Sequence, residues 1–296
     1  MSIVGASRGW LVALWVVSTL GCGGSVRSSR TEDEARQLVP VPICVQRLPR
    51  RAAPGSVIAL EAREYWSLLL PGFDARASML DLSVADCSGR WTLQGNGQRG
   101  AKLAVKPDEL VLGSGPDGLK AAWLPLASDT SARTGLLALL RQREQVLEVY
   151  ALGVHSTAAG NSRLELERMG PALAVAALEE QCRGSAADRS CSSACTVYLM
   201  SSGRLIASAR FPVDQRAQGI VAGATSRGEY RFNASPEYRS DGIALSEKLT
   251  VSEPGRGEVR SFELQRTLRL QDERLTPSAE SLWVQTARQL GLPENP

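Results

Sequence analysis

The feature that most constrains this fold is a succession of short apolar or alternating runs, separated by turn signals at roughly eight- to twelve-residue spacing. Residues 80–84, 164–166 and 230–232 alternate between apolar and polar side chains, and the longest alternation runs over residues 259–270. A period of two places successive side chains on opposite faces of a strand. The sequence therefore predicts a mainly β fold, with an antiparallel, meander-like or sandwich-like body.

One helix is expected at the end of this body. Thr276 is a suitable N-cap and Pro277 a suitable first helical residue. Gly291 and Pro293 end the segment. Apolar side chains recur at i, i+4 and i+7 along one face, at Trp283, Ala287 and Leu290. We expect this face to pack on the sheet.

Two shorter segments stay undecided between helix and strand. Residues 61–70 read as an apolar strand but are also compatible with a helix. Residues 136–140 form a continuous apolar run that is too short for its period to decide.

The first 21 residues have the layout of a secretory signal. A short amino-terminal region carries Arg8, an uncharged and largely apolar run extends from Trp10 to Leu20, and small residues lead to Cys22. A membrane-spanning helix needs about 20 apolar residues, and this run is about half as long.

Thr19-Leu20-Gly21-Cys22 resembles the lipobox of bacterial lipoproteins, although Leu is the usual residue at the position of Thr19. The resemblance covers only this short motif. It implies that Cys22 is alkylated with diacylglycerol, that the signal is cleaved before it, and that the new amino terminus is acylated. Several acyl chains anchor a protein far more firmly than one chain does. In Gram-negative lipoproteins an Asp after the modified Cys favours the inner membrane, so Gly23 favours the outer membrane.

The remaining chain divides into a tether and a body. Residues 22–38 are rich in Gly, Ser and mixed charge, which cannot bury enough apolar surface to fold alone. Residues 39–296 form the β-rich body, with a candidate sub-boundary near residue 128 or 217. The net charge of +3 is small for 296 residues, so composition does not favour a nucleic-acid partner.

Five further cysteines would lie in an oxidising compartment, where disulfides persist. Cys44 and Cys87 have no near neighbours and are expected to pair with each other. Cys182 and Cys191 bracket a polar loop and form the second expected pair. Cys195 shares the alternation of an apolar face and is expected to be buried, although Cys182 with Cys195 is the alternative pairing.

Metal and nucleophilic chemistry lack the necessary residue patterns. The three clustered cysteines have no fourth zinc ligand nearby, and the single histidine, His155, has no partner at ligand spacing. His155 is expected on the surface. Ser156 follows it on a strand and therefore points to the opposite face, so the two do not form a dyad. We predict no catalytic residue and no metal site.

The segment Gly113–Gly118 matches G-x-G-x-x-G, the dinucleotide fingerprint. That motif must open a helix, and here Pro116 lies inside the loop while Pro125 follows soon after. A Pro-Asp-Gly turn between two strands explains the residues better. We predict no bound cofactor.

Two weaker features concern binding. Trp66, Trp91 and Trp123, with Tyr65, are candidates for a sugar- or peptide-binding surface, but core packing is the default for aromatic side chains. Glycoside hydrolysis needs two carboxylates facing each other across a cleft. The pair Glu179-Glu180 is expected to be solvated surface.

Together these patterns predict a lipid-anchored lipoprotein of a Gram-negative cell envelope, held at the outer membrane through Cys22. Its body is expected to be a non-enzymatic structural or interaction module. Its partners would be the membrane, through the lipid, and an envelope protein or glycan. A carbohydrate- or peptidoglycan-binding module is the first alternative, and a hydrolase with an unrecognised carboxylate site is the second.

Overall fold

The computed structural model describes residues 40–50, 58–89, 102–126, 132–158, 161–183, 190–220, 227–253 and 257–291. All of them belong to a unit that spans Val39–Pro296. The signal, the tether and Cys22 lie outside the described residues. Residue 128, a candidate sub-boundary, also lies outside them, and residue 217 lies within a continuous strand.

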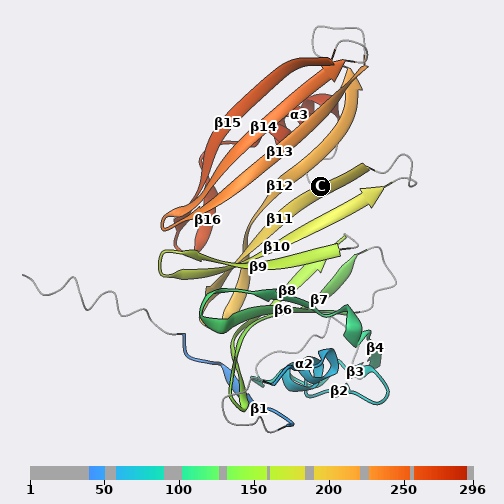
Figure 1. The fold of residues 1–296 in the computed structure, drawn as a ribbon, viewed down its shortest axis with the longest axis vertical. Helices are drawn as coiled ribbons and strands as arrows, with labels where there is room; N and C mark the ends of the chain where they lie inside the picture. The colour runs from blue at the N-terminus through green and yellow to red at the C-terminus, as the bar shows by residue number, and fades with distance from the viewer. Residues whose placement is uncertain are drawn as a thin grey trace, which may run out of the picture. The chain divides into compact units, whose positions relative to one another are not determined.

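The described chain is mainly β, as the alternation predicts, with two α-helices (Figure 1). None of the described helices has the length and apolar character needed to cross a membrane. The elements are β1 (Cys44–Arg47), α2 (Ala62–Leu69), β2 (Phe73–Asp74), β3 (Met79–Asp81), β4 (Lys102–Ala104), β5 (Val111–Ser114), β6 (Leu119–Pro125), β7 (Arg133–Arg143), β8 (Val146–Thr157), β9 (Asn161–Met169), β10 (Ala172–Arg183), β11 (Ser190–Ser201), β12 (Arg204–Ile220), β13 (Arg227–Arg239), β14 (Gly242–Glu253), β15 (Gly257–Gln271), β16 (Arg274–Pro277) and α3 (Leu282–Leu290).

The strands pair mostly with their sequence neighbours, in antiparallel hairpins. One run pairs β5 through β8, a second pairs β9 through β12, and a third pairs β12 through β16. The long strand β12 belongs to two of these runs, because its first part pairs with β11 and its last part with β13. A short parallel contact between β8 and β12 joins the first run to the others, and β2, β3 and β4 form a separate small sheet.

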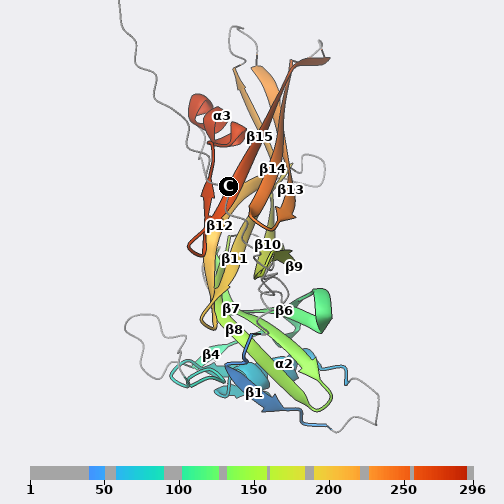
Figure 2. The same cartoon turned by 90° about the vertical axis from the view of Figure 1, so that its left-hand side faces the viewer.

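Four hydrophobic cores hold these layers together. The first lies between α2 with its small sheet and one face of β6–β8, and the second lies between the other face of β6–β8 and β9–β11. The third lies between β9–β12 and β14–β16, and the fourth lies beneath α3 on β13 and β14. Figure 2 shows α2 beside β6–β8 and α3 beside β12–β15.

Strand β7 shows why residues 136–140 have no clear period. Leu136, Ala138 and Leu140 face the first core, while Leu137 and Leu139 face the second. A strand buried on both faces reads as a continuous apolar run instead of an alternation. The segment is therefore a strand.

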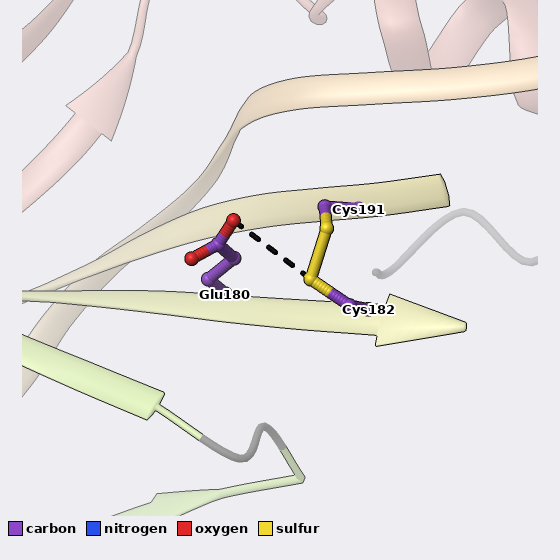
Figure 3. Close-up of side chains that lie close together, drawn as sticks. All are labelled: Glu180, Cys182 and Cys191. Atoms are coloured by element: carbon purple, nitrogen blue, oxygen red, sulfur yellow. Dashed lines mark hydrogen bonds between the residues drawn. A yellow bond between two sulfur atoms is a disulfide. The ribbon is translucent and has the colours of Figure 1, made fainter. Parts of the chain in front are cut away.

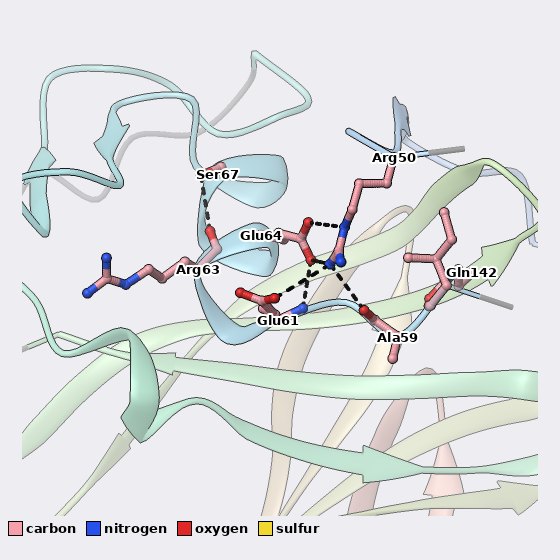
Figure 4. A network of polar contacts seen from close by, with 8 residues as sticks. Arg50, Ala59, Glu61, Arg63, Glu64, Ser67 and Gln142 are labelled. Carbon is pink, nitrogen blue, oxygen red and sulfur yellow. Dashed lines mark hydrogen bonds and ion pairs between the residues drawn. The ribbon is translucent and has the colours of Figure 1, made fainter. Parts of the chain in front are cut away.

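The other undecided segment contains a helix, α2. Glu61 and Glu64 form a capping box, in which the Glu61 N–H donates to the Glu64 carboxylate at 2.7 Å. Arg50 donates to both oxygens of the same carboxylate, at 3.1 and 2.7 Å (Figure 4). Tyr65 and Trp66 are buried against β6–β8, so the helix packs its apolar face on the sheet.

The carboxy-terminal helix exists, but its predicted start was wrong. Pro277 is the last residue of β16 and lies opposite Leu268, so strand pairing keeps this segment extended. The helix begins at Leu282, and the Ser281 hydroxyl accepts the Trp283 N–H at 3.2 Å as the N-cap. Gly291 ends the helix in the left-handed conformation, as the sequence indicates.

Candidate functional site

The candidate site is a groove where strands β8 and β12 separate. The two strands pair only at Leu152 with Arg204 and at Gly153 with Leu205, and no further pairing joins them among the described residues. A Cβ atom at Gly153 would lie 2.4 Å from the Leu205 carbonyl oxygen, so this close contact requires glycine.

Beyond that contact each strand follows a different neighbour. β8 continues along β7 to Thr157, whereas β12 continues along β11 and then along β13. The gap between them holds two adjoining recesses that share Val154 and Ala207, each with a volume of about 500 Å³ or slightly more. We call the two recesses together the β8–β12 groove. It is lined by Ile43, Asp86, Ser88, residues 152–154, Ser156, Thr196, Tyr198 and residues 202–210.

The first recess combines a buried carboxylate with apolar walls. Asp86 is only 4% exposed; its Oδ1 accepts the Ser88 N–H at 2.8 Å and the Ser88 hydroxyl at 2.6 Å. Asp86 Oδ2 is buried and has no hydrogen-bond partner. Leu152 and Leu205 are buried in the wall, and Val154 and Ile206 are 39% and 48% exposed.

A disulfide fixes Asp86 at this recess. Cys87, the next residue, is bonded to Cys44 at the start of β1, and β1 pairs with the start of β8. Ile43 lies on the same wall as Asp86, against the tight β11–β12 turn at Gly203, where φ is +79°. The Cys44–Cys87 pair is the one expected from the sequence. The disulfide therefore holds Asp86, which belongs to the segment that covers the first core, at the edge of the sheet.

The second recess has both apolar and polar lining side chains and lies beside a buried carboxylate, Glu179. Its two oxygens accept hydrogen bonds from Thr157 and Thr196, each at 3.0 Å, and from Arg210 at 3.3 Å. Arg210 is partly exposed and lines the recess. The expectation that Glu179-Glu180 is solvated surface was wrong for Glu179. Alternation points the two side chains to opposite faces, so Glu180 alone is exposed.

His155 is also not the surface residue that we expected. It is fully buried, its Nδ1 lies 2.8 Å from the Tyr198 hydroxyl, and its ring meets the edge of Trp123 at 4.9 Å between centroids. Burial, together with the positive charge of Arg210, lowers the pKa of His155 to about 4. The apolar second core accounts for this burial, because β8 turns His155 toward Tyr198 of β11 and Thr157 toward Glu179 of β10.

The predicted absence of a His155–Ser156 dyad agrees with the geometry of β8. Ser156 is exposed on the opposite face, where its hydroxyl lies 2.8 Å from that of Thr134. Burial raises the pKa of Tyr198, and the negative charge of Glu179 raises it further. A neutral, buried imidazole next to a protonated phenol is therefore a packed polar pair instead of an acid–base site.

The second disulfide joins Cys182 and Cys191, which lie directly opposite each other on β10 and β11. Glu180 is close to both sulfur atoms (Figure 3). Because both sulfurs are in a disulfide, neither is a thiolate, and this group lacks the soft ligands that zinc needs. The Cys182 sulfur lies 3.8 Å from the Glu180 carboxylate, but a disulfide sulfur carries no proton, so this contact is not a hydrogen bond.

Cys195 is the free cysteine among the described residues, and it is buried in the third core, as the alternation predicts. Burial raises the pKa of its thiol to about 12, with smaller contributions from its surroundings. It is therefore protonated and chemically inert at neutral pH.

The segment Gly113–Gly118 forms a turn between two strands. β5 ends at Ser114, a short 3-10 turn covers Pro116–Gly118, and β6 begins at Leu119. Asp117 and Gly118 have φ values of 56° and 72°, which suits a tight turn. No helix follows for a pyrophosphate to meet, so the segment does not have the geometry of a dinucleotide site.

The aromatic residues proposed for a binding surface do not gather at the groove. Tyr65 and Trp66 are buried in the first core, and Trp123 is buried in the second. Trp91 lies outside the described residues. Core packing is therefore the role of the three described aromatic residues of this set.

Sequence reasoning missed Asp86, Glu179 and the groove itself. The predicted Cys44–Cys87 pair was the one available signal for Asp86, since it placed residue 86 beside β1. No family model matches the chain, and no curated protein or solved structure shows significant similarity to it.

Proposed function

We propose that this chain is a membrane-anchored lipoprotein of the Gram-negative cell envelope, and that its β-rich body is a non-enzymatic interaction module. The leader, the match to the lipobox at Cys22 and the polar tether to residue 38 support the anchor. Two disulfides suit an oxidising compartment, as expected for an exported protein. Gly23 supports the outer membrane as the destination.

The observation that carries the interaction role is the β8–β12 groove. Ligand sites are commonly concave, mainly apolar and furnished with a few fixed polar groups. Here Val154 and Ile206 expose apolar surface beside a buried carboxylate, and the Cys44–Cys87 disulfide holds one wall in place. A prearranged recess of this kind binds without first ordering its own backbone.

The polar groups near the groove support binding over catalysis. The His155 imidazole is inaccessible and bonded to Tyr198, so it cannot accept a proton from a bound substrate. The Glu179 carboxylate already accepts hydrogen bonds from three side chains, and Cys195 is a buried thiol.

The two alternatives keep less support. A carbohydrate-binding module would use exposed aromatic faces, and Trp66 and Trp123 are buried. A glycoside hydrolase would need two carboxylates facing each other across a cleft. The buried carboxylates among the described residues are Asp86, Glu179 and Glu247. Asp86 lines the first recess, Glu179 is bonded to Thr157, Thr196 and Arg210 behind the second recess, and Glu247 is bonded to Arg266 and to the start of α3.

Metabolic labelling tests the anchor. Cells expressing the wild type or Cys22→Ala are supplied with labelled palmitate and fractionated. We expect label and membrane association in the wild type and neither in the variant, because acylation occurs at this sulfur. The anchor is wrong if the wild type takes up no label, or if Cys22→Ala labels and partitions as the wild type does.

Chemical crosslinking of intact cells tests the interaction role. We expect the anchored wild type to yield discrete complexes that Cys22→Ala yields less of, because tethering raises the local concentration of the body near its partner. An unlipidated body that gives the same complexes at the same yield would contradict a role tied to the membrane.

A further inference from the structure

The Asp86 carboxylate is the most unusual polar group in the groove. Its side chain is more than nine-tenths buried, one oxygen is saturated by Ser88, and the other has no partner. Buried polar atoms are nearly always hydrogen-bonded, and a buried charge without partners carries a large desolvation cost. A ligand that donates a hydrogen bond to Oδ2 would remove that cost.

We propose that the Asp86 end of the β8–β12 groove binds a primary ammonium group carried on an apolar chain. An ammonium is the donor best suited to an incompletely partnered carboxylate, because the hydrogen bond is charge-assisted and the two charges compensate each other. A compact ammonium also needs less space beside a buried carboxylate than a planar guanidinium does.

The walls of the recess define the rest of the ligand. Five aliphatic side chains line the same recess as Asp86, and two of them, Val154 and Ile206, are partly exposed; the five are Ile43, Leu152, Val154, Leu205 and Ile206. A volume of about 500 Å³ accommodates a short alkyl chain. An alkyl chain that ends in an ammonium therefore matches both the polar end and the walls.

Arg204 is the cation on this recess, and it does not oppose the binding of an ammonium at Asp86. Its side chain is exposed, so water and salt screen its charge, whereas Asp86 is buried. No ion pair joins Arg204 and Asp86 among the described residues. Arg204 is thus available to any anionic group on the remainder of the ligand.

Two sources share this chemistry: a lysine side chain of a partner protein and a small alkylamine. The inference rests on the proposal that the groove is the interaction surface. Its test uses the purified protein and needs neither the anchor nor a cellular partner. If the amine does not bind, the results of palmitate labelling and of crosslinking in cells still stand. If labelling or crosslinking fails, the result of the amine titration still stands.

The experiment titrates the purified full chain with n-hexylammonium and follows backbone amide resonances by NMR. Hexanol and hexanoate, which have the same chain without the positive charge, serve as matched probes. Blocked lysine, acetylated at the α-amino group and amidated at the carboxyl group, tests the protein source. The variants are Asp86→Asn, Ile206→Ala and, as a control at an exposed carboxylate far along the chain, Asp241→Asn.

We expect n-hexylammonium to shift the amide resonances of Gly153 and Gly203, and hexanol and hexanoate to bind at least tenfold more weakly. Asp86→Asn should weaken n-hexylammonium at least tenfold, because a hydrogen bond to a charged group is lost. Asp241→Asn should not change it. Tighter binding of blocked lysine than of n-hexylammonium identifies a protein partner, and the opposite order identifies a small amine.

The proposal is overturned if n-hexylammonium does not bind, if hexanol binds equally well, or if Asp86→Asn leaves its affinity unchanged. Should Asp86→Asn fail to fold, Ile206→Ala decides. Ile206 is half exposed, so truncating it should leave the fold intact while weakening n-hexylammonium several-fold through lost apolar contact. An unchanged affinity of Ile206→Ala would then overturn the proposal.

Discussion

The ion pair between Glu247 and Arg266 offers the sharpest test of how the sheet holds α3. The two side chains are 0% and 5% exposed, and Arg266 Nε donates to Glu247 Oε1 at 2.5 Å. Glu247 Oε2 accepts the Leu282 N–H at 2.8 Å, where α3 begins. One carboxylate thus satisfies both a buried guanidinium and an otherwise unpaired donor at the helix start.

The expected loss of unfolding free energy depends on whether a substitution leaves one of the two charges buried without its partner. Glu247→Leu should lower the free energy of unfolding by about 4 kcal/mol, because it buries the Arg266 charge without a partner and frees the Leu282 N–H. Arg266→Met should cost about 3 kcal/mol, since Glu247 keeps its bond to the helix. The double variant should cost only about 1 kcal/mol, because no charge remains buried and one cap bond is lost.

Urea unfolding of the four proteins, followed by circular dichroism, measures these values. The double variant should be more stable than either single variant. As a control, Lys248 and Glu263 form an exposed pair at 3.7 Å on the same two strands. Lys248→Met should cost less than about 1 kcal/mol. If the losses of Glu247→Leu and Arg266→Met simply add in the double variant, the two groups are not a buried pair and the reasoning is wrong.

Two further predictions concern stability. The pKa of His155 is 6.5 in the unfolded protein and about 4 in the folded protein. The stability that neutral His155 contributes is therefore complete above pH 6.5 and is lost as the pH falls toward 4. Between pH 7 and pH 4 the wild type should lose about 3 kcal/mol more than His155→Phe in urea unfolding, and parallel losses would contradict this. Removing the Cys44–Cys87 disulfide, which spans 43 residues, should cost about 4 kcal/mol, against about 2.5 kcal/mol for Cys182–Cys191, which spans 9. Unfolding of the paired Cys→Ala variants checks this order, and a reversed order would count against it.

Much of the fold could be predicted because alternation and turn chemistry are local. Leu268 is buried in the third core and Leu270 packs against it, as their spacing indicates, whereas Phe262 on the same face is exposed. Gly291 ends α3 as expected. The start of α3 could not be predicted locally. Thr276 and Pro277 are good starting residues for a helix, but pairing of β16 with β15 keeps them extended, and the start depends on the distant Glu247.

The site was harder to predict because it depends on contacts between distant strands. From the sequence alone Glu179 is expected at the surface. In the fold it is buried, because Thr157 of β8 and Thr196 of β11 donate hydrogen bonds to its carboxylate. His155 is likewise expected to be exposed, but in the fold Trp123 and Tyr198 pack against its ring. Nothing in the neighbourhood of these residues in the sequence indicates partners that lie 17 or more positions away.

The groove was the hardest feature to predict, because it forms where β8 separates from β12, and these two strands are far apart in the sequence. Gly153 permits their single close contact, but a glycine inside a strand has several structural explanations. Residues 80–84 alternate like a strand that continues toward Cys87, but β3 ends at Asp81, so Asp86 lies beyond it. The pairing of Cys87 with Cys44 ties Asp86 to β1.

The central claim, that the body acts through the β8–β12 groove, is tested most directly by photocrosslinking in intact cells. A photoreactive amino acid replaces Ile206 in the groove or, as the control, Ser246 on the exposed face of β14. We predict a discrete adduct from position 206, weakened by Asp86→Asn, and none from position 246. No adduct from position 206, or the same adducts from both positions, would contradict the account.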